Sequence, residues 1–467
     1  MIPMALSEIS SILKGDLVLP AGVEESHVIS GFSDTDSRLI EPGWIFFAKP
    51  GEETDGHLFI PQAIERGAAL LVVDRAVTAS VPHIIVPDTV EALADLAREV
   101  VSRVRSRGRL KIIGITGSNG KTTTKNLVAA LCAEHGETVW PKASFNNEVG
   151  APLTMLRVTF DTKFLVLELG ASGIGHIERL TRIAPLDIAV ALMVGLAHAG
   201  EFGGIENTII AKTEIIRGLV PGGVSILNRD DPRVRLMAEV APGPIRWFGL
   251  SEGCDYRASR ISTSLSGTSF TLETDGESRL VQFKVLGEHH VMNALAAIAV
   301  ARELGFPLDA VLATLSEVSR AERWRMEVLT GNAFTVINDA YNASPDSMAA
   351  ALKTLIQVAP AGSRTIAVLG EMAELGEFSG EEHDRIALLV VRLNIDALVV
   401  VGEEARRLHI SAINEGSWDG ESVYFASPDE AYDYVVGHVA PGDVILVKSS
   451  NSANLRFLGD RLGEVSA

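Results

Sequence analysis

A glycine-rich segment near residue 120 has the residue types and spacing of a phosphate-binding loop. It reads Gly117-Ser118-Asn119-Gly120-Lys121-Thr122-Thr123 and lies between a short apolar run and a stretch with helical periodicity. Glycines allow backbone N–H groups to point at an anion, and the amino end of the following helix adds about half a positive charge. The segment predicts a nucleotide phosphate site, although a glycine-rich turn that only caps a helix has the same composition.

Three side chains at or near this loop are suited to phosphate and metal chemistry. Lys121 can reach the β- and γ-phosphates of a nucleotide, and the Thr122 hydroxyl can bind Mg²⁺. Glu168 ends the apolar run 164–167. A carboxylate at the carboxyl end of a strand beside a phosphate loop is well placed to hold Mg²⁺, the alternative being a solvated strand end. The loop lacks the first glycine of the longer G-x-x-x-x-G-K-[ST] motif, because Ile115 occupies that position.

The shortened loop from Thr116 to Thr122 resembles that of the Mur ligase family, whose members use ATP to form amide bonds, and further motifs of the family recur over almost the whole chain. The resemblance implies that ATP phosphorylates a substrate carboxylate and that an amine then displaces the phosphate. It also implies that His198 binds a second Mg²⁺ and that CO₂ carbamylates Lys212, which turns a cation into a metal-binding anion. The residues next to them in the sequence suggest other roles. They make His198 more typical of a structural histidine, and they make Lys212 more typical of an exposed helix lysine.

The resemblance also implies the contacts to the rest of the nucleotide. The segment Gly287-Glu288-His289-His290-Val291-Met292-Asn293 is similar to a family motif that begins a helix. Asn293 is suited to the adenine edge, because an amide offers a donor and an acceptor together. In the family, an arginine at Arg325 faces the phosphates after domain closure. Asp339 is expected at the ribose or the metal shell, and Tyr341 can stack on a flat ring.

Several stretches are similar to the family member that joins D-alanyl-D-alanine to UDP-N-acetylmuramoyl-tripeptide. They include residues 340–343, 345–348 and 368–376 together with His383, which help to seat the dipeptide in that member. The resemblance implies these substrate-binding residues: Ser37 and Arg38 for the UDP group, Asn146 and Asn147 on the substrate side of the central domain, and Asn342 near the dipeptide. The pattern departs from the family at Ser172, at Glu201 and at Asn451, where an arginine is more usual.

Apolar runs alternate with helical stretches along most of the chain beyond residue 108. The predicted buried strands are 111–115, 164–167, 188–192 and 224–227, followed by 334–337, 365–369, 397–401 and 444–447. Strands this apolar, alternating with helices, imply parallel sheets covered on both faces. We expect an α/β protein of three domains: a small mixed α/β domain (1–108), a central P-loop-type parallel-sheet ATPase domain (109–324) and a C-terminal Rossmann-like ligase domain (325–467). The resemblance implies that the first of these domains binds the UDP-linked substrate.

The composition restricts the partners. The chain has 467 residues and a formal net charge of −19, which opposes binding to nucleic acid and to anionic membranes. It has two cysteines, Cys132 and Cys254, too few for a disulfide framework. No apolar run is long enough to span a bilayer, and the first residues do not resemble a signal peptide. We expect a cytoplasmic monomer that uses ATP and Mg²⁺ on small substrates.

Other functions fit parts of the pattern. Another amide ligase of the family is the nearest alternative, either the tripeptide-forming member or a folylpolyglutamate synthase, which would lack the first domain. A nucleotide-dependent switch would not need Glu168, His198 and Lys212 together. A small-metabolite kinase would not need a separate C-terminal α/β domain.

Overall fold

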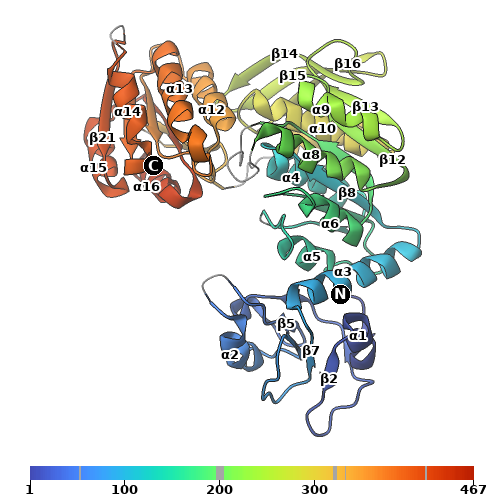
Figure 1. Ribbon diagram of the computed structural model, residues 1–467. Helices are drawn as coiled ribbons and strands as arrows, with labels where there is room; N and C mark the ends of the chain where they lie inside the picture. Colours follow the sequence, from blue (N-terminus) through green and yellow to red (C-terminus); the bar gives the residue numbers. More distant parts are fainter. Residues whose placement is uncertain are drawn as a thin grey trace.

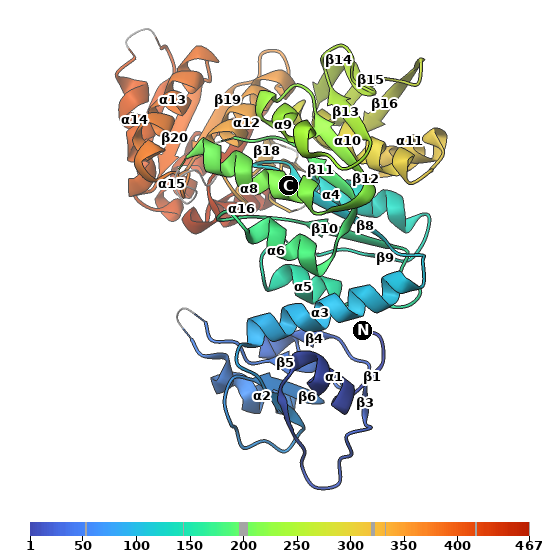
Figure 2. The same ribbon diagram turned by 45° about the vertical axis from the view of Figure 1, so that its right-hand side comes forward.

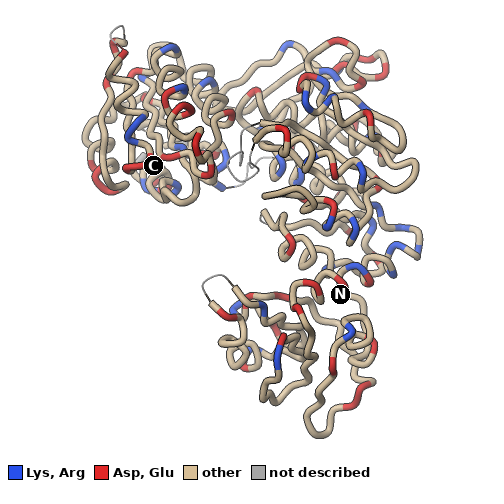
Figure 3. The backbone as a smooth tube through the Cα atoms, in the orientation of Figure 1, with Lys and Arg blue, Asp and Glu red and all other residues tan. Residues whose placement is uncertain are grey.

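The computed structural model describes residues 1–51, 54–142, 144–195, 204–318, 323–331, 333–415 and 418–466. Each of three successive parts of the chain builds its own main β-sheet. Figure 1 shows the first part (blue) below the central one (teal to yellow), and the last (orange to red) beside the central one. Acidic and basic residues are interspersed over all three parts (Figure 3).

The first part is a small mixed sheet with helices. Its elements are β1 Met4–Ala5, α1 Leu6–Leu13, β2 Asp16–Val18, β3 Val28–Ile29, β4 Ser33–Asp34, β5 Ile45–Phe47, α2 Ile60–Glu65, β6 Leu70–Val73, β7 His83–Ile85 and α3 Thr89–Ser106. The sheet order is β2-β7-β6-β5-β4, with only the β2–β7 pair antiparallel. Every residue of β5 and β6 is buried, because both faces of this sheet are covered.

The central part carries the predicted parallel sheet. Its elements are β8 Lys111–Thr116, α4 Lys121–Ala133, β9 Thr138–Val139, α5 Gly150–Met155, β10 Phe164–Glu168, α6 His176–Ile183, β11 Leu186–Ala191, α8 Ile205–Arg217, β12 Leu219–Asn228, α9 Pro232–Leu236, β13 Ile245–Gly249, β14 Tyr256–Ser264, β15 Gly267–Thr274, β16 Glu277–Phe283, α10 His289–Glu303 and α11 Leu308–Glu317. The sheet order is β16-β15-β14-β13-β12-β11-β8-β10-β9, parallel from β14 to β9.

Successive residues of the parallel strands enter different hydrophobic cores. In β10, Leu165 and Leu167 pack into the core that also receives α3, α5 and α6, whereas Val166 packs into the core beneath α4 and α10. This two-sided burial explains why these strands are continuously apolar in sequence. It also confirms the predicted α/β class with a parallel central sheet.

Two antiparallel hairpins extend this sheet beyond the parallel strands. Strands β14, β15 and β16 pair with one another in antiparallel register, and in β15 alternate residues are buried. The sequence analysis did not predict these strands. Their half-polar, alternating pattern lacks the apolar continuity that identified the others.

The C-terminal part is a second α/β unit. Its elements are β17 Glu327–Thr330, β18 Thr335–Asn338, α12 Pro345–Val358, β19 Thr365–Leu369, α13 Ser379–Arg392, β20 Ala397–Val401, α14 Arg406–Ile413, β21 Glu421–Phe425, α15 Pro428–His438, β22 Val444–Lys448 and α16 Leu455–Ser466. The sheet order is β17-β18-β22-β19-β20-β21, with only β17 antiparallel. The predicted Rossmann-like arrangement is therefore present.

Helix α3 joins the first two parts of the chain in sequence, and it also packs against both of them. It lies between the first sheet and the central part (Figure 2) and contacts α1, α5 and α6. One hydrophobic core runs from Leu6 and Ile9 through α3 to Leu165 and Leu167. No helix in the described ranges combines the length and apolar composition that a membrane span requires.

Candidate active site

The phosphate loop lies between the end of β8 and the start of α4, as the sequence predicts. Gly120 is the residue before α4 and has φ of +84°, a backbone conformation that favours glycine. A β-carbon at Gly120 would also overlap the side-chain amide of Asn293. Ser118 fixes the loop to the segment after β11, because its Oγ accepts a hydrogen bond from the Gly195 N–H at 2.8 Å. The loop is thus held open toward a neighbouring cleft.

Lys121 is folded over its own loop. Its Nζ donates hydrogen bonds to the carbonyl oxygens of Gly117 at 2.8 Å and Ser118 at 3.4 Å. Burial lowers the pKa of Lys121; the carboxylate of Glu168 acts in the opposite direction, and the Arg325 guanidinium lowers the pKa further. An anion that enters the cleft would meet this ammonium group and the loop amides together.

Glu168 offers an oxygen that no described residue contacts by a hydrogen bond. Its side chain is buried at the end of β10, and Oε1 accepts a hydrogen bond from Asn146 Nδ2 at 2.9 Å. Among the described residues its Oε2 is buried without a hydrogen-bond partner, which is costly for a carboxylate and fits a cation ligand. No group of three or more His, Cys, Asp or Glu side chains forms a metal cluster within the described ranges. Mg²⁺ commonly takes one or two carboxylates together with phosphate oxygens and water, so Glu168 alone can supply a protein carboxylate for it.

Residues of the C-terminal part cross the cleft to the phosphate loop. Arg325 Nη2 donates to Thr122 Oγ1 at 3.2 Å and to Ser144 Oγ at 3.3 Å, and its guanidinium lies 4.0 Å from the centre of the Tyr341 ring. The Tyr341 hydroxyl also donates to Ser144, at 3.4 Å. The sequence analysis did not identify Ser144, because its position relative to Arg325 and Tyr341 depends on how the two domains meet.

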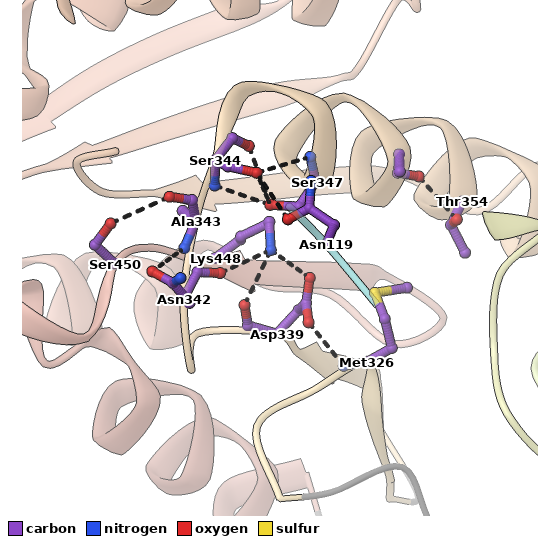
Figure 4. Close-up of polar contacts among 11 residues, drawn as sticks. Asn119, Met326, Asp339, Asn342, Ala343, Ser344, Ser347, Thr354, Lys448 and Ser450 are labelled. Carbon is purple, nitrogen blue, oxygen red and sulfur yellow. Dashed lines mark hydrogen bonds and ion pairs between the residues drawn. The ribbon is translucent and has the colours of Figure 1, made fainter. Parts of the chain in front are cut away.

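A second set of polar contacts orders the loop after β18 (Figure 4). Lys448, at the end of β22, is buried and donates from Nζ to Asp339 Oδ2 at 2.6 Å and to the Asn342 carbonyl at 3.0 Å. Asn119 of the phosphate loop accepts a hydrogen bond from Ser344 Oγ at 3.1 Å. Lys448 was visible in the sequence only as a cation that ends an apolar strand, and no role was predicted for it.

Two histidines, His289 and His290, also line the cleft together with Asn293. Asn293 Nδ2 donates to His290 Nδ1 at 3.0 Å, so the proton of neutral His290 lies on Nε2. That Nε2 is buried without a partner in the described part of the chain. Burial lowers the pKa of His289 from 6.5 to about 4 and holds the pKa of His290 well below its usual range. Both rings are therefore neutral at pH 7.

The buried His289 makes stability depend on pH. Its pKa of about 4 lies below the ordinary 6.5, so the unfolded chain binds more protons between these values. The stabilisation from neutral His289 is complete above pH 6.5 and is lost as the pH falls toward 4. We expect the unfolding temperature to drop by about 5 °C over this range because of this group. In calorimetry, a His289→Gln variant should show a smaller drop, and an equal drop would contradict this explanation.

Most of the predicted nucleotide residues lie around this single cleft. Its lining includes Ser118, Asn119, Gly120, Lys121, Thr122, Thr123, Asn146, Glu168, Asn293, Arg325, Asp339, Tyr341 and Asn342. Residues far apart in the sequence therefore form one site, with Gly117 joined to it through Lys121.

A second cavity adjoins the nucleotide cleft. Its lining includes Asn147, His176, Arg179 and Lys212, and it shares Lys121 and Asn146 with the first. Lys212 lies on α8, is buried, and its Nζ has no hydrogen bond or ion pair with a described residue. Burial, and secondarily the charge of Lys121, hold the pKa of Lys212 well below its usual range. The exposed helix lysine that its sequence neighbours suggested is therefore wrong, since Lys212 is buried.

Some predicted residues lie elsewhere or have another role. Ser37 is buried and donates to Gln62 Oε1 at 2.6 Å, and Arg38 is exposed and paired with Asp36; neither lines the two cavities. His383 is buried. It accepts a hydrogen bond from the Met372 N–H at 3.2 Å and donates one from Nδ1 to the Ser379 carbonyl at 2.6 Å, so it stabilises the loop after β19. His198 and Glu201 lie outside the described residues.

Sequence models of one family match the three parts of the chain in order. The Mur ligase family catalytic domain matches residues 31–101, the Mur ligase middle domain residues 115–301 and the Mur ligase glutamate ligase domain residues 324–451. The UDP-N-acetylmuramoyl-tripeptide–D-alanyl-D-alanine ligase of Mycobacterium bovis is 40% identical, over 99% of this chain and 98% of that protein. This chain belongs to the Mur ligase family.

Solved structures of Mur ligases agree with its fold over nearly their full length. MurF from Acinetobacter baumannii superposes with a TM-score of 0.88 at 30% identity, over 99% of each chain. MurF from Thermotoga maritima in complex with ADP superposes with a TM-score of 0.82 at 28% identity, over 94% of this chain and 99% of that one.

Proposed function

We propose that this Mur ligase uses ATP to join D-alanyl-D-alanine to UDP-N-acetylmuramoyl-tripeptide, the last cytoplasmic step in making the peptidoglycan pentapeptide precursor. The full-length relatives that carry this activity in their names support the substrate assignment. The observation that carries the chemistry is that Lys121 and Asn146 line both cavities. A terminal phosphate in one cavity and a carboxylate in the other would therefore meet beside Lys121.

The proposed reaction has two steps. A carboxylate oxygen of the tripeptide attacks the γ-phosphorus of ATP, the bond from that phosphorus to the β–γ bridging oxygen breaks, and ADP leaves. The amine of the dipeptide then attacks the acyl carbon of the acyl phosphate and loses a proton, and inorganic phosphate leaves. The protein forms no covalent bond in this scheme. It contributes position and charge, through the loop amides, Lys121 and Arg325.

Mg²⁺ fits the residues of the cleft. We assign Thr122 and the unpartnered Glu168 Oε2 as its ligands, with His198 as the ligand that the sequence suggests for a second ion. When bound, Mg²⁺ neutralises phosphate charge. We further propose that Lys212 is carbamylated, since burial favours the uncharged amine, which is the form that reacts with CO₂, and the product would be an anion beside Lys121. A carbamate there would add a further acidic metal ligand.

The remaining roles are proposed from position. Asn293 reads the adenine, Tyr341 stacks on the base or ribose, and Asp339 contacts the ribose, as their common place around the cleft supports. Asn146, Asn147 and Asn342 bind the peptide substrates by their place in the two cavities. Ser37 and Arg38 are assigned to the UDP group from the family resemblance alone. These roles use residues of one chain and all three predicted domains (1–108, 109–324 and 325–467). The proposal therefore requires no second subunit, and we propose a monomer that carries out the cytoplasmic step named above.

Phosphate release tests this function directly. With ATP, Mg²⁺ and UDP-N-acetylmuramoyl-tripeptide, we expect rapid release only when D-alanyl-D-alanine is also present, and a pentapeptide product by mass spectrometry. Another amino acid that replaces the dipeptide would assign the chain to a different amide ligase of the family. No release with any amine would favour a nucleotide-dependent switch.

A further inference from the structure

The backbone on both sides of Arg325 is strained. Trp324 has φ of +63° and Met326 has φ of +52°, and both carry a β-carbon. Left-handed backbone is unfavourable for such residues, because the β-carbon approaches the following carbonyl oxygen. Two strained residues that flank one arginine persist only where surrounding contacts hold them.

Hydrogen bonds of the backbone, to the loop after β18 and to the start of β17, hold the two strained residues. The Met326 N–H donates to Asp339 Oδ1 at 2.9 Å (Figure 4). The Tyr341 N–H donates to the Trp324 carbonyl at 3.1 Å. The Trp324 N–H donates to Glu327 Oε2 at 3.0 Å. These contacts tie the segment to the loop after β18, but they leave the Trp324 side chain to be fixed separately.

Asp460 of helix α16 fixes that side chain. Its two carboxylate oxygens each lie 3.0 Å from Trp324 Nε1, the single donor of the indole. The same carboxylate accepts from Asn338 Nδ2 at 3.1 Å and from Arg323 Nη2 at 2.9 Å. The Trp324 ring also packs edge-on against Phe457 of α16, with 6.0 Å between ring centres. Trp324 is therefore attached to the last helix of the C-terminal part.

Arg325 lies between Trp324 and Met326, and its side chain extends across the cleft. The Arg325 guanidinium lies over the Tyr341 ring and donates to Thr122 of the phosphate loop at 3.2 Å. We propose that Asp460 and Trp324 are positioning residues for Arg325: the carboxylate on α16 locks the indole, and the locked segment aims the guanidinium at the phosphates of bound ATP. This rests on the proposed function, in which Arg325 contacts those phosphates.

A merely structural anchor would behave differently. It would lower stability, or alter every kinetic parameter together, because it would act only on the folded fraction. A positioning role predicts a selective loss toward ATP that disappears when Arg325 itself is absent. The two roles are therefore separable by kinetics and by a double-mutant cycle.

Trp324→Phe is the mildest variant, because it removes the indole N–H but keeps a smaller aromatic ring against Phe457. We expect kcat/KM for ATP to fall by about tenfold, with the KM for ATP carrying most of the change and the KM for the tripeptide unchanged. Asp460→Asn should give a similar selective loss and serves as the second variant should Trp324→Phe unfold. Arg461→Ala is the matched control: it removes an ion pair of the same helix, to Asp429, whose arginine is 43% exposed, and activity should stay within about twofold.

Arg325→Ala completes the cycle. We expect it to lower kcat/KM for ATP by about 100-fold, and adding Trp324→Phe should lower it by no more than about twofold again. The positioning role would be overturned if the two losses multiplied in the double variant, or if the Trp324→Phe enzyme had wild-type activity. Neither result would affect the proposed function. An Arg325→Ala enzyme with wild-type activity would instead overturn the role of Arg325 in the proposed function.

Discussion

Replacing Lys121 with alanine is expected to lower turnover by at least about 100-fold, which is about 2.7 kcal/mol of lost transition-state stabilisation. Lys121 is the cation that lines both cavities, and its Nζ lies against the carbonyls of Gly117 and Ser118. Charge that moves from the γ-phosphate to the leaving ADP would lose its nearest protein counter-charge in the variant. Phosphate release at saturating ATP, tripeptide and dipeptide measures the effect.

Lys142→Ala is the matched control for this experiment. Lys142 is an exposed lysine of the same domain and lines neither of the two cavities. We expect its turnover to stay within about twofold of wild type, as is usual for surface substitutions. A Lys121→Ala enzyme that keeps more than about a tenth of wild-type turnover would refute the role assigned to Lys121.

Replacing Lys212 with alanine is expected to lower turnover by about 100-fold or more, and short carboxylic acids should restore part of the activity. Lys212 is buried, its pKa is held well below the usual range by burial, and it faces the cavity that Lys121 also lines. The alanine variant leaves a space that acetate or propionate can fill with a carboxylate in place of the proposed carbamate. Turnover is measured as a function of acid concentration at constant ionic strength.

The Lys121→Ala enzyme is the control for rescue, because an added anion cannot replace a lost cation. We expect no activation of that enzyme by the same acids. Equal activation of both variants would show a nonspecific salt effect, and a fully active Lys212→Ala enzyme without added acid would contradict the carbamylation proposal.

The parts of the site that were predictable from sequence are local. The order of apolar strand, glycine-rich turn and helix places residues 117–123 without knowledge of any other segment, because a helix amino end with free N–H groups is itself the anion site. Glu168 was predictable in the same way, as a carboxylate that ends an apolar strand. Its unpartnered Oε2 became visible only in three dimensions.

The parts that were not predictable depend on contacts between distant segments. Ser144 becomes notable only when Arg325 and Tyr341 approach it from another domain, and Asp460 only when α16 packs against Trp324. Lys212 shows the limit most clearly, because its helix reads as amphipathic and only the fold shows that this lysine faces inward. A single sequence gives period and propensity, whereas burial of a charged side chain is decided by tertiary packing.

Oxygen transfer from the tripeptide to phosphate is the most direct test of the central claim, that the chain activates a carboxylate with ATP before an amine attacks it. The terminal carboxylate of UDP-N-acetylmuramoyl-tripeptide is labelled with ¹⁸O, and the enzyme is given ATP, Mg²⁺ and D-alanyl-D-alanine. We expect one ¹⁸O atom in each inorganic phosphate released, together with an equal amount of pentapeptide product. Unlabelled phosphate would mean that water, and not the carboxylate, attacks ATP, and would contradict the account.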